Sequence, residues 1–201
     1  TVTDVDGNVY LDCASASASV PLGAGRPELF GPVTEALTRL GNEDSHALVS
    51  ELTAELGERL LAVSPASLTR YDIALNGTEA VEIAIKLMRR ATGRPVILAF
   101  HGSYHGESTL TAALGAEAAE ISRGLRGLVG GFVHVPYPHP YRTPLRDPVP
   151  GGSGDATVDY IRDHLLFHAL DPSEVAGVMI EPVLGSGGCV GTSNGDAPPL
   201  T

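Results

Sequence analysis

The sequence predicts an α/β fold with a mainly parallel sheet, and three observations support this prediction. From residue 71 onward, short apolar segments that suit strands alternate with longer segments that suit helices. The segment 96–100 is almost entirely apolar, which is typical of a parallel strand buried on both faces. The 201 residues include 24 glycines and 15 prolines, which indicates many turns and loops between the elements.

The first 70 residues predict a hairpin followed by helices. The triplet Asp-Gly-Asn at 6–8 separates two short apolar segments, so we expect a β-hairpin at the N-terminus. Pro32 suits the first turn of a helix that runs to about Leu40. A second helix is expected over 46–61 because leucines recur there at every fourth position. These leucines are Leu48, Leu52, Leu56 and Leu60.

The elements after residue 70 alternate between strand and helix. We expect strands over 71–75, 96–100, 132–135 and 175–180, and helices over 79–91, 107–114 and 156–170. The apolar face of the first of these helices should consist of Ala80, Ile83, Ala84 and Leu87. Such alternation implies right-handed crossovers between parallel strands. The Pro/Gly-rich segment 136–154 is too long to be a simple connection.

Charge and composition exclude several classes of function. Thirteen basic against 24 acidic residues give a net charge of −11, which disfavours a nucleic-acid surface or a polybasic membrane patch. The sequence contains no run of 18 apolar residues, so it predicts no helix that spans a membrane. The N-terminus does not look like a signal peptide. Cys13 and Cys189 form no disulfide framework. The two cysteines are therefore expected to be free thiols in a reducing compartment, which predicts a cytoplasmic protein.

Asn76, Gly77 and Thr78 form the first candidate site, a tight turn between an expected strand and an expected helix. The first N–H groups of a helix lack internal partners, and together with the helix dipole they attract anions. Gly77 lets a phosphate approach the backbone, and the Thr78 hydroxyl can donate to it. Because the motifs of triphosphate and dinucleotide sites are missing, the turn suits a single phosphate group. The alternative is an ordinary helix capped by Asn76 or Thr78.

The loop 101–106 is the second candidate site. It follows an apolar strand, and open α/β sheets bind ligands outside the carboxyl ends of their strands. Tyr104, His101 and His105 can stack on and hydrogen-bond a flat ligand. The glycines in the loop argue against a helix, so the four-residue spacing of the histidines predicts no zinc or other metal site. The alternative is a loop with solvated histidines.

Glu181 is the third candidate, at the end of an expected buried strand. Pro182 follows it directly, and a glycine-rich loop expected to be mobile lies at 185–188. The carboxylate can accept hydrogen bonds from a cationic ligand group or hold an arginine. The alternative is a carboxylate that simply leaves the sheet into water.

These features occur at successive strand ends, and the segments that carry them resemble the class III aminotransferases, which use pyridoxal phosphate. The matching segments are DGNVYLD at 6–12, LGAGRP at 22–27, NGTEA at 76–80, TGRP at 92–95, GSYHG at 102–106, HVPYP at 134–138 and IEPV at 180–183. The resemblance implies a PLP-dependent transferase of fold type I, similar to aspartate aminotransferase. Residues 1–31 would then form a hairpin and pocket segment belonging to the small domain. Residues 32–201 would form the N-terminal part of the large cofactor-binding domain, whose mainly parallel sheet is incomplete in this chain.

The resemblance also implies roles for individual residues. Gly77 and Thr78 match the phosphate-binding positions, and Tyr104 matches the aromatic residue that stacks on the pyridine ring. His105 matches the histidine beside it. Glu181 matches a glutamate near the phenolic oxygen of the cofactor and the substrate. Two residues of the N-terminal segment, Ser17 and Ala18, match positions that border the substrate pocket.

The catalytic lysine of the family has no match among these residues. The resemblance implies that the lysine carrying the cofactor as a Schiff base lies beyond Thr201, as does the aspartate that binds the pyridine nitrogen. The single lysine of this chain, Lys86, lies mid-helix, about 12 Å along the axis from Thr78. Glu82 precedes it by four residues, which favours a solvated ion pair. We therefore expect Lys86 to be a surface residue.

The activity that the resemblance implies is transamination. An amino group would move from an amine or amino acid to a keto or aldehyde acceptor, with pyridoxal phosphate as cofactor. The resemblance also implies a homodimer. Two alternatives stay open: another pyridoxal-phosphate reaction on the same fold (aminomutase, racemase or decarboxylase), or a truncated chain that has no turnover of its own.

Overall fold

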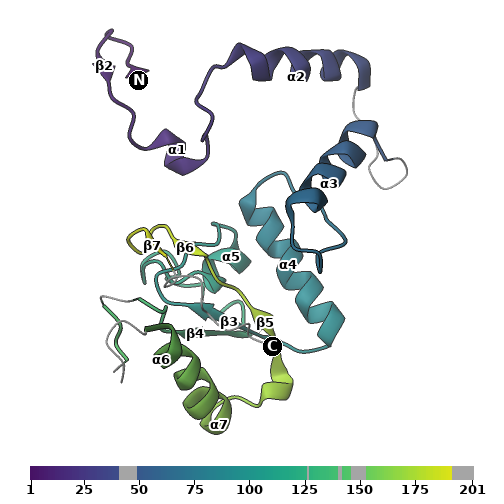
Figure 1. Ribbon diagram of the computed structural model, residues 1–201. Helices are drawn as coiled ribbons and strands as arrows, with labels where there is room; N and C mark the ends of the chain where they lie inside the picture. The colour runs from purple at the N-terminus through teal and green to yellow at the C-terminus, as the bar shows by residue number, and fades with distance from the viewer. Residues whose placement is uncertain (41–48, 126, 140–141, 146–152, 192–201) are drawn as a thin grey trace. The chain divides into compact units, whose positions relative to one another are not determined.

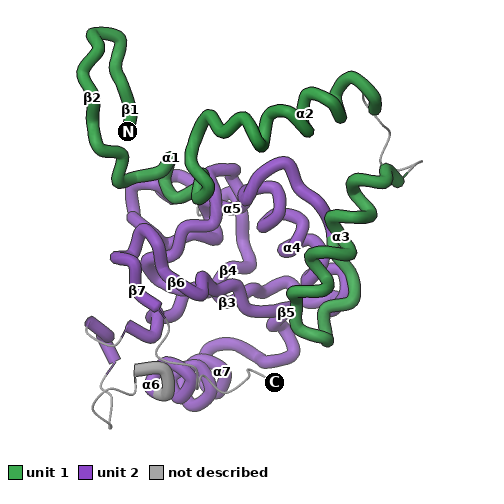
Figure 2. The backbone as a smooth tube through the Cα atoms, turned by 45° about the horizontal axis from the view of Figure 1, so that its top comes forward, with its two compact units in different colours: residues 1–71 green, residues 72–201 purple. Residues whose placement is uncertain are grey.

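The computed structural model describes residues 1–40, 49–125, 127–139, 142–145 and 153–191. The chain divides into two compact units, residues 1–71 and residues 72–201, coloured green and purple in Figure 2. The domain boundary expected between residues 31 and 32 remains a prediction, and this position lies within a helix of the first unit. None of the helices in the described ranges is both long enough and apolar enough to cross a lipid bilayer.

The first unit begins with the antiparallel hairpin that the sequence predicts. Strand β1 (Val2–Thr3) pairs with strand β2 (Val9–Tyr10), and the Asp4 carboxylate closes the turn between them. This carboxylate accepts hydrogen bonds from the Asp6 N–H, from the N–H and side-chain amide of Asn8, and from the Tyr10 hydroxyl, at 2.9–3.0 Å. The bonds from Asn8 contribute most to lowering the pKa of Asp4 below its usual value. A few local polar contacts therefore define the hairpin.

Helices α1 (Ser15–Ala18) and α2 (Pro27–Leu40) follow the hairpin. Helix α1 is a single left-handed turn, because all four of its residues have φ between 46° and 63°. Helix α2 begins five residues earlier than expected. Pro27 rather than Pro32 occupies its first position, where the missing N–H of proline costs no helical hydrogen bond.

Helix α3 (Glu51–Val63) begins after Ser50, whose hydroxyl accepts a hydrogen bond from the Thr53 N–H at 3.2 Å. The expected residues 46–48 lie outside the described residues. The predicted leucine face is half exposed, since Leu52, Leu56 and Leu60 retain 43–45% of their accessible surface. The helix instead packs through Gly57, where an added Cβ would overlap the ring of Tyr71.

A three-stranded parallel sheet forms the centre of the second unit, as predicted. Its order is β4 (Phe132–Val135), β3 (Val96–Phe100) and β5 (Val175–Val178), with β3 in the middle (Figure 1). Strand β5 ends two residues earlier than expected. In the register, Phe100 pairs with Val135 and Leu98 pairs with Val178. All three strands therefore present their carboxyl ends at one edge.

Helices cover both faces of this sheet. On one face, Ile97 and Ala99 of β3 pack against α4 (Gly77–Thr92) and α5 (Thr109–Leu114), with Ile85 and Leu114 fully buried between them. The alternating residues Leu98 and Phe100 face the opposite side, because successive side chains of a strand point to opposite faces. This arrangement explains why the whole of β3 is apolar.

The opposite face is covered by a continuous helical segment. It consists of α6 (Ser153–Asp159), the π-helical η1 (Tyr160–Leu165) and α7 (Leu166–His168). Ile161, 7% exposed, packs in this core. The sequence predicts one α-helix over 156–170, so the helix is confirmed but its π-helical turns are not predicted.

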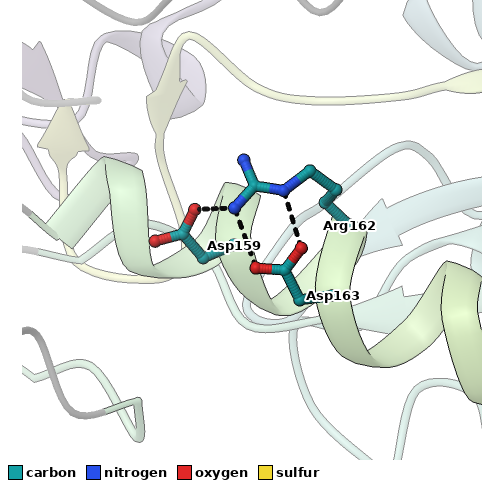
Figure 3. Close-up of polar contacts among 3 residues, drawn as sticks. All are labelled: Asp159, Arg162 and Asp163. Carbon is teal, nitrogen blue, oxygen red and sulfur yellow. Dashed lines mark hydrogen bonds and ion pairs between the residues drawn. The ribbon is translucent and has the colours of Figure 1, made fainter.

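The solvent side of η1 carries an exposed ion-pair cluster, drawn in Figure 3. The guanidinium of Arg162 binds the Asp159 carboxylate at 2.6 Å and the Asp163 carboxylate at 2.7 and 2.8 Å. The hydrogen bonds from Arg162 lower the pKa of Asp163, and those to Asp163 and Asp159 raise the pKa of Arg162. Because these groups are open to solvent, they contribute little to the stability of the fold.

The predicted apolar face of α4 is wrong for two of its residues, Ala80 and Leu87, whereas Ile83 and Ala84 are half-buried. The residues that pack toward the sheet are Val81, Ile85 and Met88, whereas Leu87 is 57% exposed and Ala80 is also exposed. Both sets have helical spacing, and the sequence offers two adjacent apolar stripes. The position of the sheet determines which stripe is buried.

The strand predicted over 71–75 is also not formed. These residues carry no strand pairing in the described part of the chain, and the Leu75 side chain is 93% exposed. The Leu75 N–H donates instead to the Glu79 carboxylate at 2.7 Å. An extended segment becomes a strand only when a neighbouring backbone takes up its N–H and C=O groups.

The chain after the 3₁₀ turn η2 (Pro172–Glu174) and β5 contains a hairpin that the sequence does not predict. Strand β6 (Val183–Leu184) pairs antiparallel with β7 (Val190–Gly191), and the loop expected to be mobile forms the turn between them. Leu184 is buried in the core, where it contacts Gly187. The hairpin therefore packs on the edge of the sheet where the candidate site residues lie.

The Arg89 side chain connects α4 to the start of the sheet. We therefore expect Arg89→Ala to lower the free energy of unfolding by about 2 kcal/mol. Its guanidinium donates to the carbonyl of Pro95 at 2.9 Å and of Gly130 at 3.0 Å, and lies 5.1 Å from the centroid of the Phe132 ring. Urea unfolding of the full protein measures the change. The matched control is Arg90→Ala, at an exposed position one residue later, which should shift stability by less than about 0.5 kcal/mol. Equal effects of the two substitutions would contradict the role of Arg89.

Candidate functional site

Helix α4 begins at the turn that the sequence predicts as an anion site. Asn76 caps the helix, because its side-chain oxygen accepts from the Glu79 N–H at 2.9 Å and its carbonyl accepts from the Ala80 N–H at 3.1 Å. Within the described residues, the N–H groups of Gly77 and Thr78 donate to no other group. The capped helix and the anion site are therefore compatible, since two first-turn amides stay available.

The loop 101–106 meets the start of α4 at Gly106. This residue has φ of +117°, and an added Cβ would overlap Oγ1 of Thr78 and lie 2.9 Å from Oγ1 of Thr111. Thr78 is half-buried against this glycine. The close contact places the second candidate segment directly beside the first.

A second contact links α4 to the start of α5. The hydroxyl of Ser108, the N-cap of α5, donates to the Glu82 carboxylate at 2.5 Å. The expected ion pair between Glu82 and Lys86 is therefore wrong, because Glu82 pairs with Ser108 and no salt bridge joins it to Lys86. The side chain of Lys86 is exposed, as predicted.

Tyr104 and Glu181 come together across the edge of the sheet. The Tyr104 N–H donates to Oε1 of Glu181 at 2.6 Å, and the Tyr104 side chain is 43% exposed. The aromatic ring is therefore accessible to a ligand while its backbone is fixed. This pair joins the loop after β3 to the segment after β5, as the rule of strand ends predicts.

His105 is buried beside this pair, with 7% of its surface exposed. No group in the described ranges forms a hydrogen bond with its Nε2.

Burial lowers the pKa of His105 below its usual value. The negative charge of Glu181 opposes this shift, and His134 adds to it. A cavity of about 10 Å³, lined by His105, Ser103 and Glu117 among others, has room for roughly one water molecule. The alternative interpretation of the loop 101–106, in which its histidines are solvated, is therefore wrong for His105.

The buried His105 predicts that the folded protein loses stability in mild acid. Because its pKa in the folded state lies below the unfolded value of 6.5, the unfolded chain binds the proton first as the pH falls. The free energy of unfolding should therefore decrease below about pH 6.5. Urea midpoints at pH 7.5 and 5.5 measure this decrease, and His105→Gln should reduce it. His168→Gln, at an exposed histidine of α7, is the control. An unchanged acid sensitivity in His105→Gln would contradict the assignment.

Tyr137 belongs to the same network but was not predicted from the sequence. It is 4% exposed, and its hydroxyl donates to the Glu181 carbonyl at 2.9 Å and to the Val190 carbonyl at 3.4 Å. Burial raises the pKa of Tyr137, and the Glu181 carboxylate raises it further. Its position two residues after β4, at the same edge of the sheet, is the signal that could have identified it.

The structure does not bring all predicted site residues together. Ser17 and Ala18 belong to the first unit, where both are exposed in the left-handed turn α1, so their role at a substrate pocket remains a prediction. His101 stacks on His134, with ring centroids 6.2 Å apart, and Nε2 of His134 donates to the Leu114 carbonyl at 2.8 Å. Across the described ranges, no three histidine, cysteine, aspartate or glutamate side chains form a group that could hold a metal ion.

Comparisons with known proteins agree with one another. The family model described as aminotransferase class-III matches residues 1–196. An alanine/serine racemase of Pyrococcus horikoshii is 30% identical over 197 residues, which cover 94% of this chain and 40% of the relative. The 5-aminovalerate aminotransferase DavT of Pseudomonas aeruginosa is 31% identical over 189 residues, covering 94% of this chain and 42% of the relative.

Solved structures show the same similarity. A taurine:2-oxoglutarate aminotransferase of Bifidobacterium kashiwanohense, in complex with PLP and glutamate, has a TM-score of 0.76 and 25% identity. The match covers 90% of this chain and 40% of that chain. Like the two curated relatives, this enzyme is much longer than the present sequence, which spans about two fifths of their length.

Proposed function

The chain belongs to the class-III aminotransferase family, and on this premise we propose that the protein is a pyridoxal-phosphate-dependent transaminase. Its substrates would be an amine or amino acid as donor and a keto or aldehyde compound as acceptor. When bound, pyridoxal phosphate supplies the electron sink that amino-group transfer requires. The observation that carries the proposal is the meeting of the α4 N-terminus, Tyr104 and Glu181 at one edge of the sheet.

The residues at this edge fit pyridoxal phosphate. The phosphate suits the first-turn amides of Gly77 and Thr78, which have no partner in the described part of the chain and lie at the positive end of a 16-residue helix. Space for it is present, since nothing lies within 4 Å of a Cβ added at Gly77. The exposed ring of Tyr104 can cover one face of a flat aromatic ligand. His105 contributes a buried Nε2 atom that has no hydrogen-bond partner among the described residues.

The same residues define what this part of the chain does in the reaction. The helix terminus binds and orients the phosphate, and Tyr104 excludes water from one ring face. Glu181 places a negative charge beside the site, and His105 stays neutral near physiological pH because it is buried. Lys86 takes no part in this chemistry, because it is exposed on α4 and remote from the start of the helix.

We expect Thr78→Ala to weaken the binding of pyridoxal phosphate by about 1–2 kcal/mol, a value at the lower end of what one hydrogen bond to a charged group contributes. Titration of the cofactor into the full protein, followed by absorbance, measures the affinity. Thr109→Ala is the matched control, at an exposed threonine in the first turn of α5. Equal affinities of Thr78→Ala and the unsubstituted protein would contradict a phosphate site at α4.

A racemase is the second candidate function, and the 30% identity to the alanine/serine racemase supports keeping it. Incubation of the full protein with an amine donor and pyruvate distinguishes the two. A transaminase forms alanine from pyruvate, whereas a racemase only interconverts the enantiomers of added alanine. Chiral chromatography of the products gives the answer.

We also propose that the protein is a homodimer in the cytoplasm. The membership of the class-III family supports an association of two copies, and so do two exposed leucines, Leu87 on α4 and Leu75 just before the helix. Size-exclusion chromatography with light scattering tests this state. The acidic net charge of −11 gives no support for a nucleic-acid partner.

A further inference from the structure

Both carboxylate oxygens of Glu181 bind backbone N–H groups. Oε1 accepts from Tyr104 at 2.6 Å, and Oε2 accepts from Gly185 at 3.0 Å. The two donors belong to different segments, the loop after β3 and the turn between β6 and β7. Because an ionised carboxylate only accepts hydrogen bonds, and charge shortens and strengthens them, Glu181 connects two segments that have no sequence proximity.

Glu181 is itself anchored to the core of the second unit. It follows β5 by three residues and precedes Pro182, which restricts its backbone to extended conformations. Its carbonyl accepts a hydrogen bond from the buried Tyr137 hydroxyl at 2.9 Å. The ring of Tyr137 packs edge-on against Phe100, with centroids 5.9 Å apart and an interplanar angle of 82°. The carboxylate therefore extends from a rigid base.

The loop that carries Tyr104 needs such an anchor. Gly102 and Gly106, on either side, have φ of +85° and +117°, in regions where glycine gives the chain its greatest freedom. Gly102 and Ser103 are tied to Ala116 and Phe100 through their N–H groups, at 2.8 and 3.3 Å. At Tyr104 itself, the bond to Glu181 fixes the backbone.

We propose that Glu181 is a positioning residue, whose carboxylate holds the Tyr104 backbone and so sets the orientation of the exposed Tyr104 ring. The hydrogen bond to Gly185 orients the carboxylate from its other oxygen. The ring's role toward the cofactor rests on the proposed function, but the positioning itself does not. Glu181 acts through Tyr104 rather than by touching a ligand.

Amide hydrogen exchange in the full protein, prepared without cofactor, tests the positioning directly. In Glu181→Ala the amides of Tyr104 and Gly185 should exchange about 10- to 100-fold faster, the effect of losing a hydrogen bond to a charged group. In Glu181→Gln the side chain keeps one acceptor oxygen, so one of the two amides should lose more protection than the other. The control is Glu120→Gln, which removes one negative charge at an exposed position of the same unit. It should leave the exchange rates of both amides unchanged.

Exchange of the Leu98 amide in β3 serves as the internal reference for folding. If it stays slow while Tyr104 and Gly185 become fast, the effect is local to the two loops. Unchanged protection of Tyr104 in Glu181→Ala would overturn the proposal. Loss of protection throughout β3 would likewise overturn it, because Glu181 would then support the whole sheet rather than one loop.

A double-mutant cycle on pyridoxal phosphate affinity separates positioning from direct contact. If Glu181 acts through Tyr104, then Glu181→Gln should weaken binding in the unsubstituted background and have little further effect in Tyr104→Ala. Additive losses would indicate a direct contact of Glu181 with the cofactor and would overturn the positioning role. Failure of the unsubstituted protein to bind pyridoxal phosphate would overturn the proposed function alone, since the exchange result does not depend on the cofactor.

Discussion

Gly106→Ala should lower the free energy of unfolding by about 3 kcal/mol and detach the Tyr104 loop from helix α4. Gly106 has φ of +117°, which an alanine adopts only with strain, and the added Cβ would overlap Oγ1 of Thr78. It would also lie 2.9 Å from Oγ1 of Thr111, a fully buried residue that cannot move aside. Urea unfolding of the full protein measures the stability. Titration with pyridoxal phosphate should show a weakened site as well, because Thr78 is displaced.

Gly124→Ala separates backbone strain from steric overlap. Gly124 also has a positive φ, +78°, but nothing lies within 4 Å of its added Cβ. Its substitution should cost only the conformational strain, about 1–2 kcal/mol, and should leave cofactor binding unchanged. If Gly106→Ala were no more harmful than Gly124→Ala, the close packing of the loop on α4 would be refuted.

Tyr104→Ala should reduce the affinity for pyridoxal phosphate by about 5- to 150-fold, which corresponds to the roughly 1–3 kcal/mol that aromatic stacking on a flat heterocycle contributes. Its side chain is 43% exposed while its N–H is fixed by Glu181, so the ring can pack on a ligand without a large rearrangement. Because the ring rather than the hydroxyl makes this contact, Tyr104→Phe should retain most of the affinity. Equilibrium titration by absorbance compares the three proteins.

Phe167→Ala is the control for loss of an exposed aromatic ring. Phe167 is 78% exposed on α7, and it packs edge-on against His168. Its removal should leave the affinity unchanged. Full binding by Tyr104→Ala, or equal losses in the Phe and Ala variants of Tyr104, would show that the ring does not stack on the cofactor.

Elements whose signals are local were predicted well from the sequence. Strand β3 was predicted with its observed bounds because its apolar run suits only a strand buried on both faces. Helix α4 was predicted to within two residues at its start and one at its end. Asn76 caps its start, and Gly93, at φ of +70°, ends it. The signals for both elements are local: the two caps of α4 adjoin the helix, and the apolar run of β3 lies within the strand itself.

Two elements that depend on distant partners were predicted poorly. The segment 71–75 has the composition of a strand but no pairing in the described part of the chain. The hairpin of β6 and β7 was not predicted because its strands have two residues each, and its packing depends on Leu184 entering the core. Hydrogen bonding between strands is a tertiary event, so composition alone does not decide it.

The sequence by itself determined the α/β order, the capped start of α4 and the positions of Thr78, Tyr104 and Glu181 at helix and strand ends. Each of these follows from the conformational preferences of a few adjacent residues. Only the tertiary structure decided that Val81 and Ile85 rather than Ala80 and Leu87 face the sheet. It also decided that Glu181 binds the Tyr104 N–H and that Nε2 of His105 is buried with no hydrogen-bond partner among the described residues. These outcomes depend on contacts between residues as many as 77 positions apart, which form only when the sheet has brought its strand ends together.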